Sequence, residues 1–243
     1  MILNDRVILI TGCTQGISKN FANVLAKHNQ LILLGRNEYK LKKLIKELGG
    51  RHKDYAADLS DQKQLKTTIE NIKHDNDKID CIFNIAGVGI YKNIEELDDA
   101  EWQYSLNLNV TAPYLLIKHL LPNLKKSNTP LIVNIGSGAG TVGMKGRCAY
   151  VASKFALRGL SLSLSEELSN QNIKVTLITL GSTLTNFGGT PVREKEKQYR
   201  QGKAYFTTKW VVDKVMEILS EDIIKDEYVL YPGDFGFGEW KKP

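Results

Sequence analysis

The chain has 243 residues, of which 42% are hydrophobic and 25% are charged. These proportions are typical of a globular protein, and they exclude disordered and fibrous classes. No apolar run approaches the ~18 residues that a membrane-spanning helix needs, and the polar residues at positions 4–6 predict that there is no secretory signal. We therefore expect a cytoplasmic protein that does not contact a membrane.

Charge, cysteine content and histidine spacing limit the ligands, the compartment and the metals that we expect. Thirty-three basic and 27 acidic residues give a net charge of +6, which favours anionic ligands but is also typical of a lysine-rich solvated surface. There is no dense basic tract with interleaved aromatic residues, so nucleic acid is not an expected partner. The three cysteines are scattered and odd in number, which fits a reducing compartment. The four histidines lack metal-ligand spacing, so no metal is expected.

Short apolar runs alternate with helical patterns along the chain. We predict strands at 6–11, 31–34, 53–57, 79–85, 131–135, 173–180 and 227–231. Apolar residues recur with a helical period over 16–28, 39–48, about 60–73, about 98–124, 150–168 and 207–219. Ser60 is the expected N-cap of the third helix, and Asp98 with Glu101 resembles a capping box.

Strands that alternate with helices predict a parallel sheet with helices on both faces. The strands are continuously apolar, as expected for strands that are buried on both sides. We therefore predict one α/β catalytic domain over residues 1–243, with a Rossmann-type, doubly wound sheet of about seven strands. Residues 181–206 break the rhythm, and we interpret 186–206 as a substrate flap.

A glycine-containing turn joins the first predicted strand to the first predicted helix. Its sequence is Thr11-Gly12-Cys13-Thr14-Gln15-Gly16-Ile17-Ser18. Glycines let the backbone approach a pyrophosphate, and a helix N-terminus offers free N–H groups with a positive partial charge. The turn therefore predicts a phosphate-binding loop, with a plain strand-to-helix turn as the alternative.

Ser137, Tyr150 and Lys154 form the strongest constellation of reactive side chains. Tyr150 and Lys154 are four residues apart on a predicted helix, so they project from one face. A free tyrosine titrates near pH ~10, and a neighbouring ammonium group favours the phenolate and lowers that pKa. Ser137 directly follows a predicted strand, where its hydroxyl can hold a substrate oxygen. The three residues predict a tyrosine general acid/base.

These motifs resemble those of the short-chain dehydrogenase/reductase family, in its compact single-domain branch, which includes 3-oxoacyl-carrier reductases. The resemblance covers about residues 5–185. Its motif residues are Thr11, Gly12, Gly16, Asp58, Asn84, Ala86, Gly87, Asn109, Ser137, Tyr150, Lys154, Gly181 and Thr185.

The resemblance implies a role for each catalytic residue. Tyr150 would give a proton to a carbonyl oxygen, or take one from an alcohol, and Lys154 would lower the Tyr150 pKa and bind the nicotinamide ribose. Ser137 would orient the substrate oxygen, and Asn109 would hold a water that links Lys154 to solvent. The cofactor-binding residues that it implies are Thr11, Gly12, Thr14, Gln15, Gly16, Ile17, Arg36, Asp58, Leu59, Asn84, Ala86, Gly87, Tyr150, Lys154, Gly181, Thr183 and Thr185.

Three positions depart from the family pattern. Ser18 replaces the third glycine of the phosphate loop, Ile85 replaces a second asparagine, and Leu180 replaces a proline. None of them is a catalytic residue. We expect these changes to affect cofactor affinity, at most modestly for the small serine, rather than the reaction.

The end of the second predicted strand indicates the choice of cofactor. A carboxylate there would accept the ribose 2′-hydroxyl and repel a 2′-phosphate. The chain has Gly35 at that place, followed by Arg36, which can pair with a phosphate. Gln15 occupies the site where many NADP-dependent relatives carry a second cation. We predict that NADP(H) is preferred, with NAD(H) as the alternative.

The flap, residues 186–206, is expected to govern the choice of substrate. It carries five basic and two acidic residues. Phe187, Tyr199, Tyr205 and Phe206 are candidates to line an apolar channel. A basic, partly apolar lid suits an acidic carrier protein that bears an acyl chain, and a mobile surface helix without a partner is the alternative.

We therefore predict an NADP-dependent enzyme that reduces a ketone or 3-oxoacyl carbonyl. An alcohol dehydrogenase that works in the oxidative direction is one alternative, and a non-catalytic nucleotide sensor is another. The resemblance further implies a homodimer or homotetramer, with an interface on the long helices that follow the fourth and fifth strands.

Overall fold

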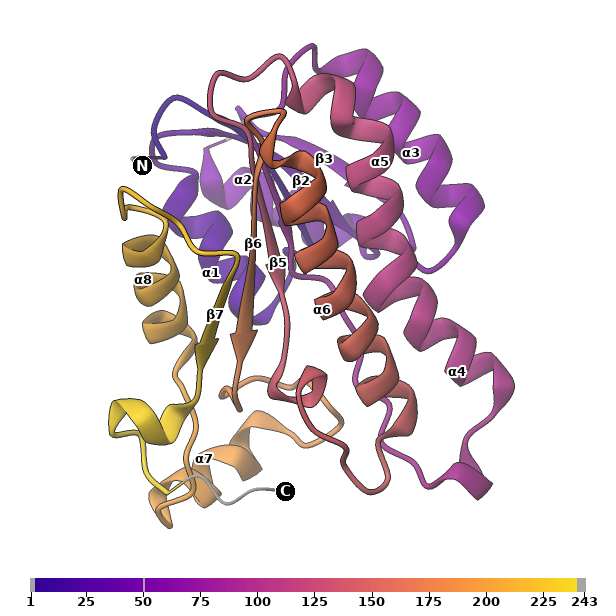
Figure 1. The fold of residues 1–243 in the computed structure, drawn as a ribbon, viewed down its shortest axis with the longest axis vertical. Coiled ribbons are helices and arrows are strands. Elements are labelled where there is room, and N and C mark those ends of the chain that lie inside the picture. Colours follow the sequence, from indigo (N-terminus) through magenta and orange to yellow (C-terminus); the bar gives the residue numbers. More distant parts are fainter. Residues whose placement is uncertain (1–2, 50, 240–243) are drawn as a thin grey trace.

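A computed structural model describes residues 3–49 and 51–239 of the chain. Seven parallel strands form one sheet in the order β3-β2-β1-β4-β5-β6-β7 (Figure 1). The strands are β1 (Val7–Thr11), β2 (Gln30–Gly35), β3 (Lys53–Ala56), β4 (Cys81–Asn84), β5 (Leu131–Ile135), β6 (Lys174–Leu180) and β7 (Glu227–Leu230). The predicted doubly wound α/β class, with about seven strands, is confirmed.

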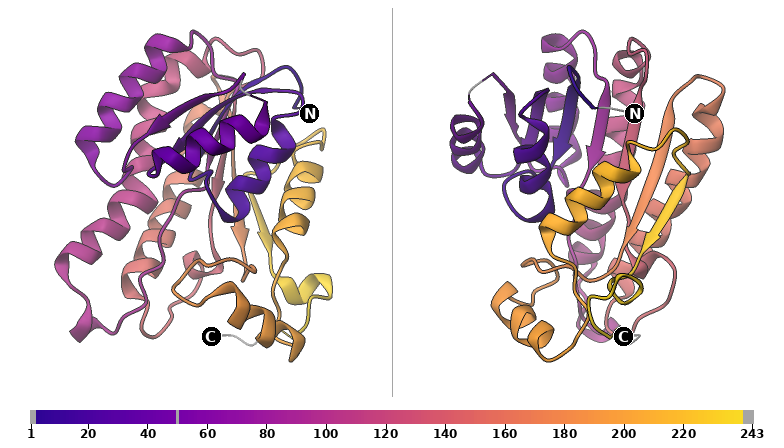
Figure 2. Two further views of the ribbon diagram at one scale, coloured as in Figure 1. Left: turned by 180° about the vertical axis from the view of Figure 1, so that it is seen from behind. Right: turned by 90° about the vertical axis from the view of Figure 1, so that its left-hand side faces the viewer.

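Helices cover both faces of the sheet (Figure 2). They are α1 (Gly16–Leu25), α2 (Glu38–Leu48), α3 (Gln62–Asp75), α4 (Asp99–Leu106), α5 (Ala112–Leu124), α6 (Cys148–Ser169), α7 (Val192–Arg200) and α8 (Thr208–Ile218). Buried side chains of α1, α2 and α8 pack on one face, and those of α3, α5 and α6 pack on the other. Within the described residues, no helix is both long and apolar enough to cross a membrane.

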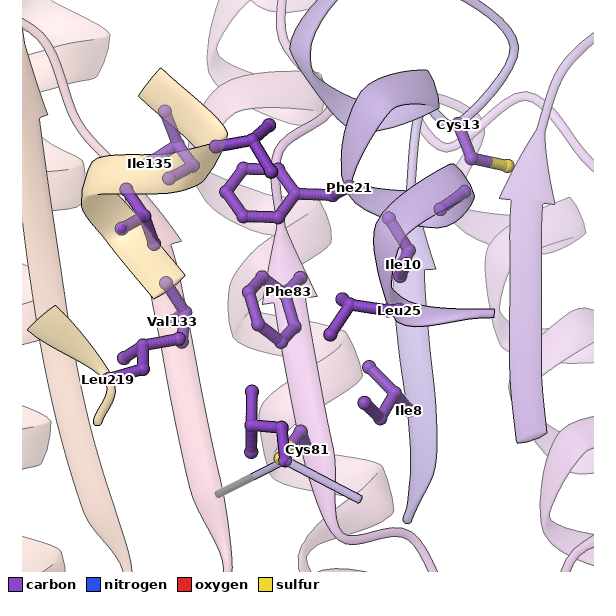
Figure 3. Close-up of a cluster of buried hydrophobic side chains, with 14 of the residues drawn as sticks. Ile8, Ile10, Cys13, Phe21, Leu25, Cys81, Phe83, Val133, Ile135 and Leu219 are labelled. Atoms are coloured by element: carbon purple, nitrogen blue, oxygen red, sulfur yellow. The ribbon is translucent and has the colours of Figure 1, made fainter. Parts of the chain in front are cut away.

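The two-sided covering explains why the strands are continuously apolar. Successive side chains of a strand point to opposite faces, so Ile8 and Ile10 enter one core while Leu9 enters the other. In the first core, Phe21 of α1 packs on Phe83 of β4 with ring centroids 5.4 Å apart (Figure 3). Each large apolar side chain buried in this way contributes roughly 1.5–3 kcal/mol.

One helix prediction needs correction. Ser60 does not cap the third helix, because Asp61 accepts hydrogen bonds from the backbone N–H groups of Lys63 and Gln64. The Ser60 hydroxyl instead donates to Asp58 at 2.6 Å. The predicted long helical stretch up to about residue 124 is confirmed, and it contains a π-helical turn, η2 (Asn107–Thr111), between α4 and α5. The capping box of Asp98 and Glu101 is confirmed.

The order of the strands reverses between β1 and β4, and this reversal determines where the site lies. β1 pairs with β2 on one side and with β4 on the other. The chain leaves β1 toward one face of the sheet and leaves β4 toward the other, so a crevice opens beyond the carboxyl ends of these strands. Helix α7 lies beyond the same ends of β5, β6 and β7 (Figure 1).

The two open edges of the sheet are formed by short strands. β3 and β7 have four residues each. On β7, Glu227 accepts a hydrogen-bonded fork from Arg158 of α6, with a nearest distance of 2.8 Å. Beside it, Asp226 pairs with Lys174 of β6 at 2.6 Å. Side-chain charges therefore fasten this edge to its neighbours.

Candidate active site

A cleft of about 870 Å³ opens at the carboxyl ends of the strands. Most of the predicted cofactor and catalytic residues line it, among them Gly12, Thr185 and Tyr150. Three predicted site residues do not line it: Thr11, Asn84 and Asn109, each of which is buried behind the wall. Thr11 and Asn109 contribute to the site through the backbone of the loop after β4, which they hold.

The phosphate loop has the conformation that its glycines predict. Gly12 and Gly16 have φ values of +72° and +62°, in the left-handed region that favours glycine. A Cβ atom on Gly12 would lie 3.0 Å from the backbone of Ala86, so the loops after β1 and β4 meet there. Helix α1 begins at Gly16, and Gln15 provides no side-chain cap. The first N–H groups of α1 are therefore available to a pyrophosphate.

Ser18, which departs from the family pattern, fits the loop without strain on its packing. Its side chain is buried, and its hydroxyl donates to the carbonyl oxygens of Gly12 and Gln15. The serine thus spans the loop from inside. This geometry supports the expectation that cofactor affinity is at most modestly affected.

Thr11 and Asn84 join neighbouring elements. The Thr11 hydroxyl accepts from the backbone N–H groups of Ile85 and Ala86 at 2.9 and 3.0 Å. Asn84 donates to Asn134 of β5 at 2.8 Å within the core. Thr11 therefore shapes the loop after β4 from behind, while Asn84 links β4 to β5, and neither side chain lines the cleft.

The predicted catalytic residues converge at the opposite end of the cleft. Tyr150 and Lys154 lie one turn apart near the start of α6, and Ser137 follows β5. The Lys154 ammonium donates to the carbonyl of Ile135 at 3.0 Å and lies 5.9 Å from the centroid of the Tyr150 ring. A Cβ atom on Gly140 would come within 2.8 Å of the Lys154 carbonyl, so glycine lets the segment after β5 pack closely on α6.

Burial dominates the titration of both groups. It raises the pKa of Tyr150, an effect to which Tyr91 adds, while a hydrogen bond with Ser137 and the charge of Arg147 oppose it. Burial also lowers the pKa of Lys154 to about 8. The predicted lowering of the Tyr150 pKa by Lys154 is therefore wrong for this structure. Desolvation of the phenolate is the largest effect on the Tyr150 pKa.

The pKa of Lys154 makes stability depend on pH. We expect Lys154→Met to raise the free energy of unfolding at pH 7 by about 1–3 kcal/mol, because it removes a buried charge. Between pH 8 and 10.5 the folded protein loses the Lys154 proton while the unfolded chain keeps it, so the wild type gains stability and the difference narrows. Urea unfolding at pH 7 and pH 10 measures this, with the exposed-lysine variant Lys125→Met as control. A difference that is constant with pH would contradict the expectation.

Asn109 lies in the π-helical turn η2, and its amide is fully engaged with neighbours. Its Oδ1 accepts from the backbone N–H of Val88 at 2.8 Å, while its Nδ2 donates to the Val88 carbonyl and to Ser153, each at 2.9 Å. A Cβ atom on Gly87 would lie 3.0 Å from Asn109 Oδ1, so this glycine permits the contact. Asn109 thus positions the loop after β4 beside Lys154.

Two cations, Arg36 just after β2 and Lys40 on α2, line the cleft near the end of β2. Arg36 is exposed and lies 3.7 Å from Asp58, measured from Nη1 to the carboxylate. Lys40, on the first turn of α2, lines the same part of the cleft. The sequence analysis did not identify Lys40; its position three residues after Asn37, the N-cap of α2, was the signal available.

The aromatic residues of the flap divide into two groups. Phe187 and Tyr205 line the cleft, as predicted. Tyr199 does not line the cleft, and Phe206 is fully buried, stacked on Trp210 at 4.1 Å. The prediction that these two line a channel is wrong, because Phe206 completes a separate aromatic cluster with α8.

Lys195 of α7 points inward rather than to solvent. Its ammonium donates to the carbonyls of Thr185 and Phe187 at 2.8 and 2.6 Å, and its side chain is buried. It therefore attaches α7 to the segment that follows β6. The other basic side chains of the flap are exposed to solvent: Arg193, Lys197, Arg200 and Lys203.

Tyr91 and Arg147 complete the wall around Tyr150, together with Phe187 of the flap. The ring centroids of Tyr91 and Phe187 lie 5.7 and 5.5 Å from that of Tyr150. Arg147 covers the Tyr91 ring, with its guanidinium carbon 4.4 Å from the centroid. The sequence analysis missed both Tyr91 and Arg147, although Arg147 lies one helical turn before Tyr150.

The fold and the site together define a nucleotide-binding α/β oxidoreductase. The model of the short chain dehydrogenase family matches residues 6–197. A protein of Thermotoga maritima named as an uncharacterized oxidoreductase is 34% identical over 189 residues, which are 75% of this chain and 74% of that protein. The 3-oxoacyl-(acyl-carrier-protein) reductase FabG of Haemophilus influenzae is 29% identical over 185 residues, or 76% of each chain.

A solved structure shows the same fold. The alcohol dehydrogenase of the archaeon Thermococcus sibiricus, complexed with 5-hydroxy-NADP, has a TM-score of 0.84 at 23% identity, covering 98% of this chain and 100% of that chain. The chain belongs to the short-chain dehydrogenase family. It is an NAD(P)-dependent dehydrogenase or reductase.

Proposed function

We propose that the protein reduces a ketone or 3-oxoacyl carbonyl with NADPH, and that one catalytic domain spans residues 1–243. The observation that carries this proposal is that Ser137, Tyr150 and Lys154 line the same cleft as a phosphate loop. The uncapped start of α1 and the exposed Arg36 fit the pyrophosphate and the 2′-phosphate of the cofactor.

The residues of the chain would divide the chemistry among them. When bound, the cofactor supplies the hydride that is transferred to the substrate carbon. Ser137 orients the carbonyl oxygen, and Tyr150 gives it a proton. The raised pKa of Tyr150 keeps the phenol protonated at neutral pH, which suits a proton donor in the reductive direction. Lys154 holds the ribose and stabilises the phenolate that remains.

A substrate panel tests this function directly. The purified protein is incubated with NADPH and with ketones, aldehydes and 3-oxoacyl thioesters, and the loss of NADPH absorbance is followed. We expect turnover of at least one ketone or 3-oxoacyl compound. If no carbonyl compound is reduced and no alcohol is oxidised, the proposed function is wrong.

The site also bears on the two alternative functions that the sequence left open. An alcohol dehydrogenase would use the same residues in reverse, with the ionised Tyr150 as the base. A non-catalytic nucleotide sensor has no need for Tyr150 and Lys154. Both are present, and both line the cleft beside Ser137.

An acyl chain on an acidic carrier protein is a second candidate substrate, favoured by the outward cations of α7. Arg193, Lys197 and Arg200 are exposed on that helix. If a carrier docks there, replacing the three with glutamine should raise KM for a carrier-bound substrate and leave KM for a small ketone unchanged. Added salt should mimic the change, since exposed charges are screened beyond about 8–10 Å. Equal changes in KM for both substrates would reject carrier docking.

We further propose a cytoplasmic homo-oligomer, a homodimer or homotetramer, that uses the helices after β4 and β5. Large apolar side chains are exposed on these helices: Trp102 of α4, Tyr114 of α5 and Phe155 of α6. Their position on neighbouring helices supports an interface there.

The fully buried thiols of Cys13 and Cys81 are compatible with a reducing compartment.

A further inference from the structure

The substrate end of the cleft contains a cation that the proposed reaction does not use. Arg147 lies at the start of α6, one turn before Tyr150, and lines the cleft. Its guanidinium stacks on the Tyr91 ring at 4.4 Å and donates to the Met144 sulfur at 3.6 Å. No carboxylate among residues 3–49 and 51–239 lies within ion-pair distance of it.

Three lysines that also line the cleft are engaged with protein oxygens. Lys154 donates to the Ile135 carbonyl, Lys195 to the Thr185 and Phe187 carbonyls, and Lys203 to Gln198. Arg147 differs from them because its planar donors meet only a thioether and a ring face in the described part of the chain. A guanidinium so placed keeps its capacity for a bidentate anion.

The acidic content of the cleft supports an anionic ligand. Among the described residues that line it, Asp58 is the single acid, and it lies at the adenosine end beside Arg36. No described carboxylate lines the substrate end of the cleft, so the lining there is positively charged. The Tyr91 ring lies against both this cation and the Tyr150 ring, and Phe187 packs on the Tyr150 ring.

We propose that Arg147 binds the carboxylate of the substrate, and that the substrate is a short oxo acid or the corresponding hydroxy acid. This inference rests on the proposed function and names its substrate class. The Tyr91 ring touches both Arg147 and Tyr150, so a carboxylate on the guanidinium and a carbonyl at the phenol belong to one small molecule. A single guanidinium fork matches a carboxylate, whereas phosphate sites usually add several backbone donors.

The test compares acids with their neutral esters. The wild type is assayed with NADPH and 3-oxobutanoate, 4-oxopentanoate and 5-oxohexanoate, each beside its methyl ester. We expect kcat/KM for at least one acid to exceed that for its ester by about tenfold or more, the worth of a charge-assisted pair. In Arg147→Met this preference should disappear, mainly through KM, and Arg147→Lys should restore part of it.

Matched variants separate anion binding from a structural role. Lys145→Met removes an exposed cation two residues away that does not line the cleft, and it should keep the preference for the acid. If Arg147 only supported Tyr91 or the Tyr150 pKa, Arg147→Met would lower kcat/KM for acids and esters equally. That result would overturn the proposal, as would a wild type that prefers the esters or an acyl thioester, although either would leave the proposed carbonyl reduction intact.

A binding measurement decides the inference if no compound is turned over. Isothermal titration of 4-oxopentanoate into the NADP-loaded protein should show binding to the wild type and to Lys145→Met, with about tenfold or greater loss in Arg147→Met. Absence of binding to the wild type, or equal binding to all three proteins, would refute the role of Arg147. Binding without turnover would support Arg147 while rejecting the proposed reduction.

Discussion

Tyr150→Phe should lower kcat by about 10²–10⁴-fold, the usual contribution of a positioned general acid. The substitution removes only the phenolic oxygen. The ring remains between Tyr91 and Phe187, with the present centroid distances of 5.7 and 5.5 Å. NADPH affinity should therefore stay close to that of the wild type, and fluorescence titration of NADPH together with steady-state turnover measures the two effects separately.

The neighbouring tyrosine supplies the control for this experiment. Tyr91→Phe removes a second phenol from the same wall and should keep most of the turnover. If Tyr150→Phe retains wild-type turnover, Tyr150 is not the proton donor. If it loses NADPH binding as well, its effect is structural.

The preference for NADPH over NADH should reverse when the residues at the end of β2 are replaced. We expect the wild type to prefer NADPH over NADH by at least tenfold in kcat/KM, because a guanidinium–phosphate contact contributes roughly 1.5–3 kcal/mol. The double variant Gly35→Asp with Arg36→Ala should prefer NADH, since it removes the cation and adds a carboxylate that accepts the ribose hydroxyl and repels the phosphate. Measurement of kcat/KM with both cofactors decides the matter.

The packing around Gly35 requires a control of its own. A Cβ atom there would lie 3.3 Å from Thr14 Cγ2 and 3.5 Å from Leu41, so a small adjustment of the loop is expected. Gly35→Ala makes the same demand without a charge and should keep the preference for NADPH. Equal kcat/KM values for the two cofactors in the wild type would show that Arg36 remains with Asp58 and does not select the 2′-phosphate.

The sequence predicted the limits of a strand best where the apolar run and the hydrogen-bonded run cover the same residues. β5 has its predicted limits, because its apolar run is also the run that pairs with β4 and β6. The run over 79–85 was longer than β4. Asp80 lies in it, just before β4: its carboxylate accepts hydrogen bonds from the Val7 backbone and from Ser127, and its backbone also bonds to Val7 and Leu131. Hydropathy locates a strand but does not say which residues form ladder bonds.

The catalytic group could be placed from sequence because α6 fixes the spacing of Tyr150 and Lys154. Arg147 could not, since it precedes that helix and its direction depends on the Tyr91 ring, which comes from a loop that carries no periodic signal. The pKa of Tyr150 was predicted in the wrong direction for a similar reason. Burial of a side chain depends on the walls that distant segments build, here Tyr91 and Phe187.

The short edge strands have a consequence for the behaviour of the protein at high concentration. An open strand edge is a template on which another chain can add a strand, and long apolar edges are therefore aggregation sites. β3 and β7 expose only four residues each, and Lys53 and Glu227 place charges on them. The charge network of Arg158 and Glu227 also fastens β7 to the helix behind it. The protein should therefore resist edge-to-edge polymerisation in a crowded cell despite a sheet of almost wholly apolar strands.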